Sequence, residues 1–410
     1  MASHSQSQIS PPTPASPPTP ISIKPLTSSA EDLNTLSTLW SQIFPQWPIE
    51  DDLLGTIIRH PLFEGQGRHF LAFENQFQSQ SQFQPSNSPE EKPVGFILTY
   101  LSLGNEDGKT KTKKRYISAI GVLPTHRERG VGGALLKRGV GALRGGVGER
   151  DGDGDGHGDG DGEGEMEKIK IVIGSETPRF WPGLPVEFTL GEGESVGVWL
   201  GRRGFNKSNG PNIKDFFKGV RTEVVSPNVK ERVEKIVKEE GLRFAPWDES
   251  GYEECMEKQN ANFSWANAYA VLASLNLYHE VLVAFDAETN QQLGWTLMCG
   301  PDASVKDMFA FLPLAGDVAF EAEAAEKDEG SKVKRGIGLI SAVGIDAKAR
   351  GRGVGLAMVV RAMENLKERG VDGIFIDSAV IKGFYEKIGF ETRWEYENWE
   401  FIGTGEEESG

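Results

Sequence analysis

One twenty-residue pattern occurs twice in this 410-residue chain, and the repetition constrains the architecture more than any other feature. The first copy is ISAIGVLPTHRERGVGGALL (residues 117–136), and the second is LISAVGIDAKARGRGVGLAM (residues 339–358). Each reads as an apolar strand, a short loop containing Arg-x-x-Gly-x-Gly, and a helix. Arg127 of the first copy aligns with Arg350 of the second. Because an internal repeat marks a repeated structural unit, we expect two copies of one fold.

A second pair of matching segments extends the repeat. WLGRRGF (residues 199–205) follows the first copy, and FYEKIGF (residues 384–390) follows the second. The spacing between the landmarks is longer in the first copy. Polar, turn-rich sequence precedes a charged helical segment near residue 220, so we predict a first domain over residues 21–220 and a second over residues 221–402.

Three segments have compositions typical of disorder. Residues 1–20 form a Pro/Ser/Thr-rich tail, residues 151–167 form an acidic Gly/Asp loop within the first domain, and residues 403–410 form an acidic tail. The Asp-Gly repeat that starts at Asp151 resembles a calcium loop. However, Gly162 occupies the twelfth position, where an EF-hand needs an acid. We therefore expect no metal here.

Charge and composition exclude several classes of function. The net charge is -16, and residues 151–167 contribute eight acids and no Lys or Arg. An acidic chain of this kind is a poor partner for nucleic acid. The sequence has no apolar run long enough for a membrane helix and no secretory signal at residues 1–20. Cys255 and Cys299 form no CxxC pair, which is consistent with a reducing, cytoplasmic location. The six histidines show no metal-ligand spacing, so His126 is expected at the surface.

The glycine-rich loop has the setting of an anion site. In the second copy, the helix that follows it places apolar residues on one face and ends before Gly370. Residues 350–355 therefore lie at a helix N-terminus, where free amides and the helix dipole favour an anion. The loop lacks the Lys of a Walker A motif and the spacing of a dinucleotide fingerprint. A pyrophosphate cradle and an ordinary Gly-rich turn are the alternatives, and the repetition favours the cradle.

The loop resembles motif A of the GCN5-related N-acetyltransferase (GNAT) superfamily, and residues 384–390 resemble its motif B. The resemblance covers residues 21–205 and 240–402, and the tandem arrangement is similar to that of mycothiol synthases and glucosamine N-acetyltransferases. It implies an α/β (α+β) class with two tandem acyl-CoA N-acyltransferase folds. Each would be a mixed, mostly antiparallel sheet with helices on both faces. Two central strands would splay apart, and acetyl-CoA, the cosubstrate, would lie in the gap.

The resemblance also implies roles for individual residues. Tyr385 matches the tyrosine that protonates the leaving thiolate, whereas the aligned Leu200 of the first copy cannot donate a proton. The second copy is therefore expected to carry the chemistry, and the first to be degenerate. In the second copy, the backbone of Ile345 would contact the pantetheine, and the loop amides would hold the pyrophosphate: Arg350, Gly351, Arg352, Gly353, Val354 and Gly355. The matching positions of the first copy are Val122, Arg127, Glu128, Arg129, Gly130, Val131 and Gly132.

Two features stay open at this level. The general base could be Asp377 or Asp346, but for either acid a solvated loop residue or a helix cap is the favoured interpretation. Ser378 stands where many relatives have an Asn. The loop TPRFWPGLP (residues 177–185) resembles one in tandem acetyltransferases that act on amino sugars, and it either lines a pocket or packs against the other copy.

These expectations combine into one hypothesis. The chain would transfer an acetyl group from acetyl-CoA to a primary amine of a small molecule, with an amino sugar as the favoured acceptor. The alternative is a non-catalytic acyl-CoA-binding or interaction protein built from decayed GNAT domains. Because two copies in one chain mimic a dimer, we expect a monomer with an internal pseudo-dimer.

Overall fold

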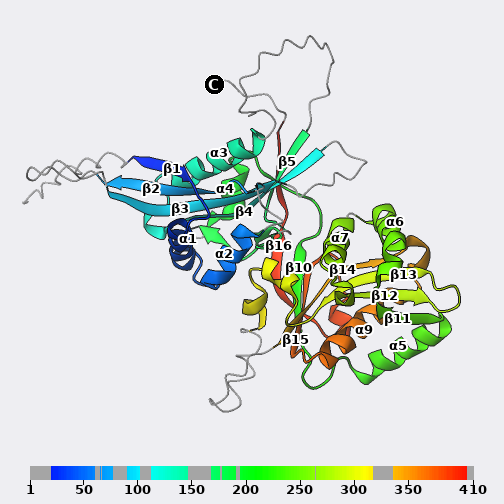
Figure 1. Ribbon diagram of the computed structural model, residues 1–410. Helices are drawn as coiled ribbons and strands as arrows, with labels where there is room; N and C mark the ends of the chain where they lie inside the picture. The colour runs from blue at the N-terminus through cyan, green and yellow to red at the C-terminus, as the bar shows by residue number, and fades with distance from the viewer. Residues whose placement is uncertain are drawn as a thin grey trace, which may run out of the picture.

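The structure is a computed structural model that describes residues 20–60, 65, 67–76, 90–101, 112–145, 168–175, 178–190, 194–263, 265–316 and 336–403. Two large β-sheets with packed helices lie next to each other, one in each half of the molecule (Figure 1). The predicted tails fall outside the described residues except for Pro20 and Gly403. The acidic loop 151–167 falls outside them entirely.

The first sheet is mixed but mostly antiparallel. Its strands are, in spatial order, β1 (Ile21–Pro25), β2 (Phe70–Gln76), β3 (Glu90–Leu101), β4 (Thr112–Val122), β5 (Lys168–Ile173), β17 (Trp399–Gly403) and β9 (Asn206–Lys207). Only β4 and β5 of these strands pair in parallel. Its helices are α1 (Ala30–Ile43), α2 (Asp51–Arg59), α3 (Val131–Arg144) and α4 (Val196–Gly201). Ser29 caps α1 by accepting a hydrogen bond from the Asp32 amide. The helices α1 and α3 lie on opposite faces of this sheet (Figure 1).

The second sheet repeats this plan. Its spatial order is β11 (Leu242–Pro246), β12 (Val281–Asp286), β13 (Gln292–Cys299), β14 (Ile337–Ile345), β15 (Gly373–Ala379), β10 (Ile213–Gly219), β16 (Glu391–Glu397) and β6 (Leu184–Pro185). The helices are α5 (Pro227–Glu239), α6 (Tyr252–Asn262), α7 (Ala266–Ser274) and α9 (Val354–Glu368). A small separate hairpin joins β7 (Thr189–Leu190) to β8 (Glu194–Ser195). These two sheets confirm the predicted fold class.

Each sheet opens between its two parallel strands. In the second sheet, β14 pairs with β15 only as far as Ile340 and Ile376, although β14 continues to Ile345. In the first sheet, the pairing of β4 and β5 ends at Ile117 and Ile173. In both sheets the strands part on the side where the glycine-rich loop follows, which is the predicted splay.

The two halves exchange strands. Strand β10 comes from the first half of the chain, but it lies between β15 and β16 of the second sheet. Strand β17 comes from the end of the second half, but it lies between β5 and β9 of the first sheet. The predicted boundary near residue 220 falls just after β10. A boundary in the sequence is therefore not a boundary in space, because the hydrogen bonds of β10 are made to the second domain.

Aromatic side chains fill the contact between the halves. The ring centroid of Trp47, which follows α1, lies 4.6 Å from that of Phe311 and 4.7 Å from that of Trp394. Trp181 of the first half lies 5.0 Å from Phe311. Buried aromatic pairs add packing energy beyond the area that they bury. The contact therefore holds the two domains together as part of one apolar core. Among the described residues, no helix has the length and apolar character needed to cross a bilayer.

Candidate functional site

The glycine-rich loop of the second copy forms the N-terminus of α9. Gly351 and Gly353 have φ values of 80° and 83°, in the left-handed region that favours glycine. The first amide of the helix to bond within it is that of Ala357, which donates to the Gly353 carbonyl at 3.1 Å. The amides of residues 354–356 precede this bond, so they are available to an anion. The sequence therefore folds locally as a strand-to-helix turn with free amides at the helix N-terminus.

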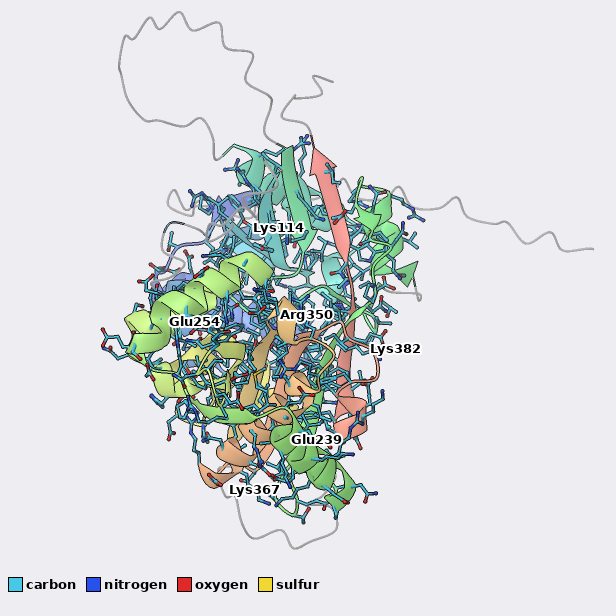
Figure 2. The ribbon with its side chains drawn as sticks, turned by 90° about the vertical axis from the view of Figure 1, so that its right-hand side faces the viewer. Lys114, Glu239, Glu254, Arg350, Lys367 and Lys382 are labelled. Atoms are coloured by element: carbon cyan, nitrogen blue, oxygen red, sulfur yellow. The ribbon has the colours of Figure 1, made fainter. Side chains whose placement is uncertain are left out.

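An arginine fixes the shape of this loop in both copies. Arg350 Nε donates to the Ile345 carbonyl at 3.0 Å, and Arg127 Nε donates to the Val122 carbonyl at 3.4 Å. Each arginine thus bonds to the residue that ends its strand, and it closes the turn between strand and helix. Figure 2 shows Arg350 between Lys114, in the first domain, and Lys367, in the last turn of α9.

A cavity of about 350 Å³ lies in front of the second-copy loop. Three exposed cations line it: Arg232 of α5, Arg350 of the loop, and Lys387. Several of the predicted ligands also line it, namely Ile345, Arg350, Gly351, Gly353, Val354 and Gly355. Arg352 does not, because its Nε bonds to Glu240 Oε2 at 2.7 Å. A positively charged cavity at a helix N-terminus fits the pyrophosphate of acetyl-CoA.

Tyr385 lies in an aromatic environment next to this cavity. Its ring centroid is 4.9 Å from that of Phe384, which lines the cavity, and 5.5 Å from that of Phe216 on β10. Burial raises the pKa of Tyr385, and the negative charge of Asp377 raises it further. No hydrogen bond joins its hydroxyl to another described residue. Tyr385 therefore remains protonated at neutral pH and has a proton to give.

The first-copy loop keeps the backbone but not the chemistry. Gly130 has a φ of 84°, close to that of Gly353, but Glu128 occupies the place of Gly351 with a φ of 64°. Trp199 stands where the second copy has Phe384, and its Cζ2 would lie 3.4 Å from a Cβ added to Gly132. Leu200 is buried in the place of Tyr385. An acidic side chain and a larger ring thus occupy the loop region, which makes it less suited to a phosphate.

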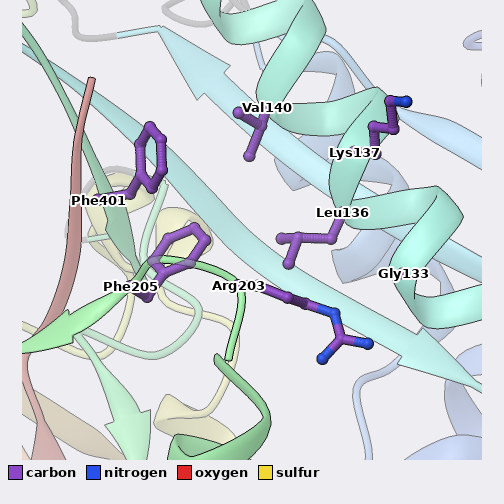
Figure 3. Close-up of a pocket in the computed structure, with 7 residues that line it drawn as sticks. All are labelled: Gly133, Leu136, Lys137, Val140, Arg203, Phe205 and Phe401. Carbon is purple, nitrogen blue, oxygen red and sulfur yellow. The ribbon is translucent and has the colours of Figure 1, made fainter. Parts of the chain in front are cut away.

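A second pocket of about 250 Å³ lies along α3 of the first domain. Figure 3 shows Phe205 and Phe401 on one side of it, and Leu136 and Val140 of α3 on the other. Phe401 belongs to the exchanged strand β17. None of the binding residues predicted for the first copy lines this pocket: Val122, Arg127, Gly130, Val131 and Gly132.

The structure shows the surroundings of Asp346 and His126, two residues that the sequence had singled out. Asp346 caps a turn by accepting from the Lys348 amide at 3.1 Å, and it lies 3.4 Å from Lys258 Nζ, so it is a structural residue. His126 is only 5% exposed, and the expectation of a surface histidine was wrong. Its Nε2 lies 3.2 Å from Glu74 Oε2 on β2, and this partner allows its burial.

The proline-rich loop after β5 packs against the other copy. The Arg179 amide donates to the Met308 carbonyl at 2.8 Å, and the Ala310 amide donates to the Arg179 carbonyl at 2.9 Å. The loop then continues into β6, which pairs with β16. Arg179 reaches Asp377 of the second domain, with 3.5 Å between Nε and Oδ2. The sequence left open whether this loop lines a pocket or packs against the other copy, and the structure shows the packing. The motifs gave no indication of Arg232, which lies outside the repeated segments.

The geometry can be compared with that of known proteins. Residues 33–149 match the model of the acetyltransferase (GNAT) family. No protein of curated function matches the sequence significantly. A solved structure described as a GCN5-related glucosamine N-acetyltransferase region in a fungal multi-domain GH3 β-N-acetylglucosaminidase is similar over 94% of this chain, with 20% identity and a TM-score of 0.71. This chain covers 38% of that one.

Two further solved structures match both halves of the chain. A GCN5-related N-acetyltransferase from Sphaerobacter thermophilus has 13% identity and a TM-score of 0.54, over 93% of this chain and 95% of that one. A tandem GNAT protein from the clavulanic acid biosynthesis pathway has 11% identity and a TM-score of 0.52, over 93% of this chain and 98% of that one. Such distant likenesses show the fold, and the family model matches the first half. The chain therefore has two GNAT folds in tandem, and residues 33–149 match the acetyltransferase (GNAT) family model.

Proposed function

We propose that the chain transfers an acetyl group from acetyl-CoA to a primary amine of a small molecule, and that the second copy is catalytic. The observation that carries this proposal is the difference between the two copies. The second copy places a cationic cavity at the α9 N-terminus next to a buried, protonated Tyr385. The first copy has Glu128 and Leu200 at the matching positions.

Each group then has a defined task. The loop amides hold the pyrophosphate together with Arg232, Arg350 and Lys387, and the Ile345 backbone contacts the pantetheine where β14 leaves β15. The neutral amine attacks the thioester carbonyl carbon, and the carbon–sulfur bond breaks. Tyr385 donates its hydroxyl proton to the leaving thiolate. The proton that the amine nitrogen loses restores the tyrosine through solvent, so that N-acetylated amine and free coenzyme A are the products.

An amino sugar is the acceptor that we favour. The support comes from the fungal structure, which is described as a glucosamine N-acetyltransferase region and matches over 94% of the chain. Aminoglycosides, polyamines and peptide N-termini are other primary amines that the same chemistry would acetylate.

The test is the release of free thiol from acetyl-CoA across these amines, with glucosamine included. We expect turnover with wild type and a decrease in kcat of roughly 100-fold or more in Tyr385→Phe, since acid catalysis contributes about 10²–10⁴-fold. Tyr278→Phe is the matched control, because Tyr278 packs on Trp247 at a centroid distance of 5.0 Å and lies away from the cavity. Stabilisation by acetyl-CoA without thiol release for any amine would instead favour a non-catalytic acyl-CoA-binding protein.

A further inference from the structure

Three charged side chains from separate parts of the chain meet where β14 and β15 part. Arg179 comes from the loop after β5, Asp215 from the exchanged strand β10, and Asp377 from β15. Arg179 Nη2 lies 2.5 Å from Asp215 Oδ1, and Arg179 Nε lies 3.5 Å from Asp377 Oδ2. The exposed fractions of the three side chains are 3%, 2% and 10%. The cluster is therefore almost completely removed from water.

The cluster has one more negative charge than positive charge. Asp215 is well satisfied, because it accepts from Tyr396 Oη at 2.8 Å and from the Ser378 amide at 3.0 Å, in addition to Arg179. Asp377 is not. Its Oδ1 is buried without a hydrogen-bond partner among the described residues, and the same is true of Oγ of the next residue, Ser378. A buried carboxylate oxygen without a partner is costly and uncommon in proteins. Asp377 is thus the carboxyl group of this cluster that has an oxygen left for a ligand.

The position of Asp377 on its strand gives the side from which a ligand would approach. Ile374 and Ile376 pack in the core that contains α9. Phe375 points to the other face, where its ring centroid lies 6.1 Å from that of Trp394. Side chains alternate along a strand, so Asp377 shares the face of Phe375. It is therefore on the face opposite α9, whose N-terminus carries the phosphate loop, and its charge still acts on Tyr385.

Contacts with the second half of the chain hold Arg179 in this position. The Arg179 amide donates to the Met308 carbonyl, and the Arg179 carbonyl accepts from the Ala310 amide, so both backbone groups of the residue are fixed. A few residues later, Leu184 and Pro185 pair with Glu397 and Tyr396 of β16. A guanidinium group has donors in a fixed planar arrangement, which lets one arginine orient two carboxylates.

We propose that Asp377 binds the ammonium group of the acceptor amine, and that Arg179 positions the Asp377 carboxylate. This inference rests on the proposed function and extends it. It assigns the ammonium group of the acceptor to the Asp377 carboxylate. It also gives the first copy a role, which is to supply the positioning residue for the acceptor side of the second copy's active site.

The test separates the two substrates. With glucosamine as the probe, Asp377→Asn should raise KM for the amine about 10- to 150-fold, the range for one hydrogen bond to a charged group. KM for acetyl-CoA should change less than about 2-fold. Arg179→Met should raise KM for the amine, and Arg179→Lys should restore part of the loss, because it keeps the charge but not the planar donors.

The controls come from the other end of the same strand. Asp372 and Arg221 form an ion pair of 3.1 Å just before β15, and Asp372→Asn and Arg221→Lys should leave both KM values unchanged. Asp377→Asn with an unchanged KM for glucosamine would overturn the proposal. Equal increases for both substrates would also overturn it, because they indicate a general loss of structure.

A direct binding measurement keeps this inference distinct from the proposed function. If wild type releases no thiol with any amine, the proposed function fails. Calorimetric titration of glucosamine into the acetyl-CoA-bound protein then still decides the role of Asp377. Binding to wild type that is lost in Asp377→Asn supports the acceptor site. Equal binding to both proteins, or binding to neither, overturns it.

Discussion

Replacing Gly351 by glutamate should give the second-copy loop the form that the first copy already has. Gly351 has a φ of 80°, and Glu128 occupies the aligned position of the first copy with a φ of 64°. A Cβ added to Gly351 would meet no atom within 4 Å. The surrounding space thus admits the larger side chain, although the left-handed φ carries a backbone cost, and the main effect on anion binding is the charge of the new residue.

The substitution has two unfavourable effects, one on folding and one on binding, and the second sets the change in Kd. A residue other than glycine in the left-handed region costs about 1–2 kcal/mol of folding stability. A carboxylate about 4 Å from one phosphate charge repels it by about 1 kcal/mol in water and about 4 kcal/mol near a protein surface. At a factor of ten for each 1.4 kcal/mol, Kd for coenzyme A should rise about 5- to 700-fold.

Calorimetric titration of coenzyme A measures this effect. Gly351→Gln is the matched control, since it has the same backbone cost and nearly the same size without the charge. Glu128→Gly makes the reciprocal change in the first copy and should leave the affinity of the second-copy site unchanged. The difference between the Glu and Gln variants should shrink at high salt. Equal Kd values for these two variants would refute the reasoning, because they would show that no phosphate charge lies near Gly351.

Three further predictions rest on other residues. Tyr269 Oη donates to the carbonyl of Ala342 at 2.8 Å, and Ala342 lies in β14 with a φ of 49°. Tyr269→Phe should therefore lower the free energy of unfolding by about 1–2 kcal/mol in denaturant titration, and it should also lower kcat. An unchanged kcat would show that this distorted part of β14 does not affect catalysis. The pKa of Tyr385 is raised, so its protonated form persists above the usual tyrosine pKa of about 10. Deprotonation of Tyr385 should therefore not lower kcat between pH 8 and about 10. A loss of kcat with a midpoint below about pH 10 that occurs in wild type but not in Tyr385→Phe would contradict the assignment. Asp215→Ala leaves Arg179 buried with one carboxylate partner fewer and should cost about 3–5 kcal/mol of stability, whereas a loss under about 1 kcal/mol would show that water reaches the pair.

The repeat predicts the parts of the structure that depend on local sequence. The strand, loop and helix of residues 339–358 could be placed from their apolar spacing and glycines, and Tyr385 followed from the second landmark. Arg232 could not be found, because a charged residue on a surface helix looks the same whether or not a cavity lies next to it. His126 was placed at the surface for a related reason, since its partner Glu74 is distant in sequence.

The sequence also did not predict which sheet the last strand of each half would join. Phe216 and Phe217 of β10 pack in different cores, so the strand's pattern shows that both of its faces are covered. Such a pattern does not say which sheet provides the neighbours. The same limit applies to Arg179, whose contact with Asp377 depends on where the exchanged strands bring the two domains together. Oligomeric state stays a prediction, and light scattering should give a mass near 44.9 kDa for a monomer.

The exchange of strands has a consequence for how this chain is made. During synthesis the first domain emerges from the ribosome long before β17, yet β17 lies between β5 and β9 in its sheet. Until residues 399–403 appear, the edge of β5 has no neighbour on that side, and unpaired strand edges promote aggregation. The sheet of the first domain therefore stays incomplete until β17, the last strand of the chain, has been synthesised. The two domains therefore complete their folding together, late in synthesis, rather than one after the other.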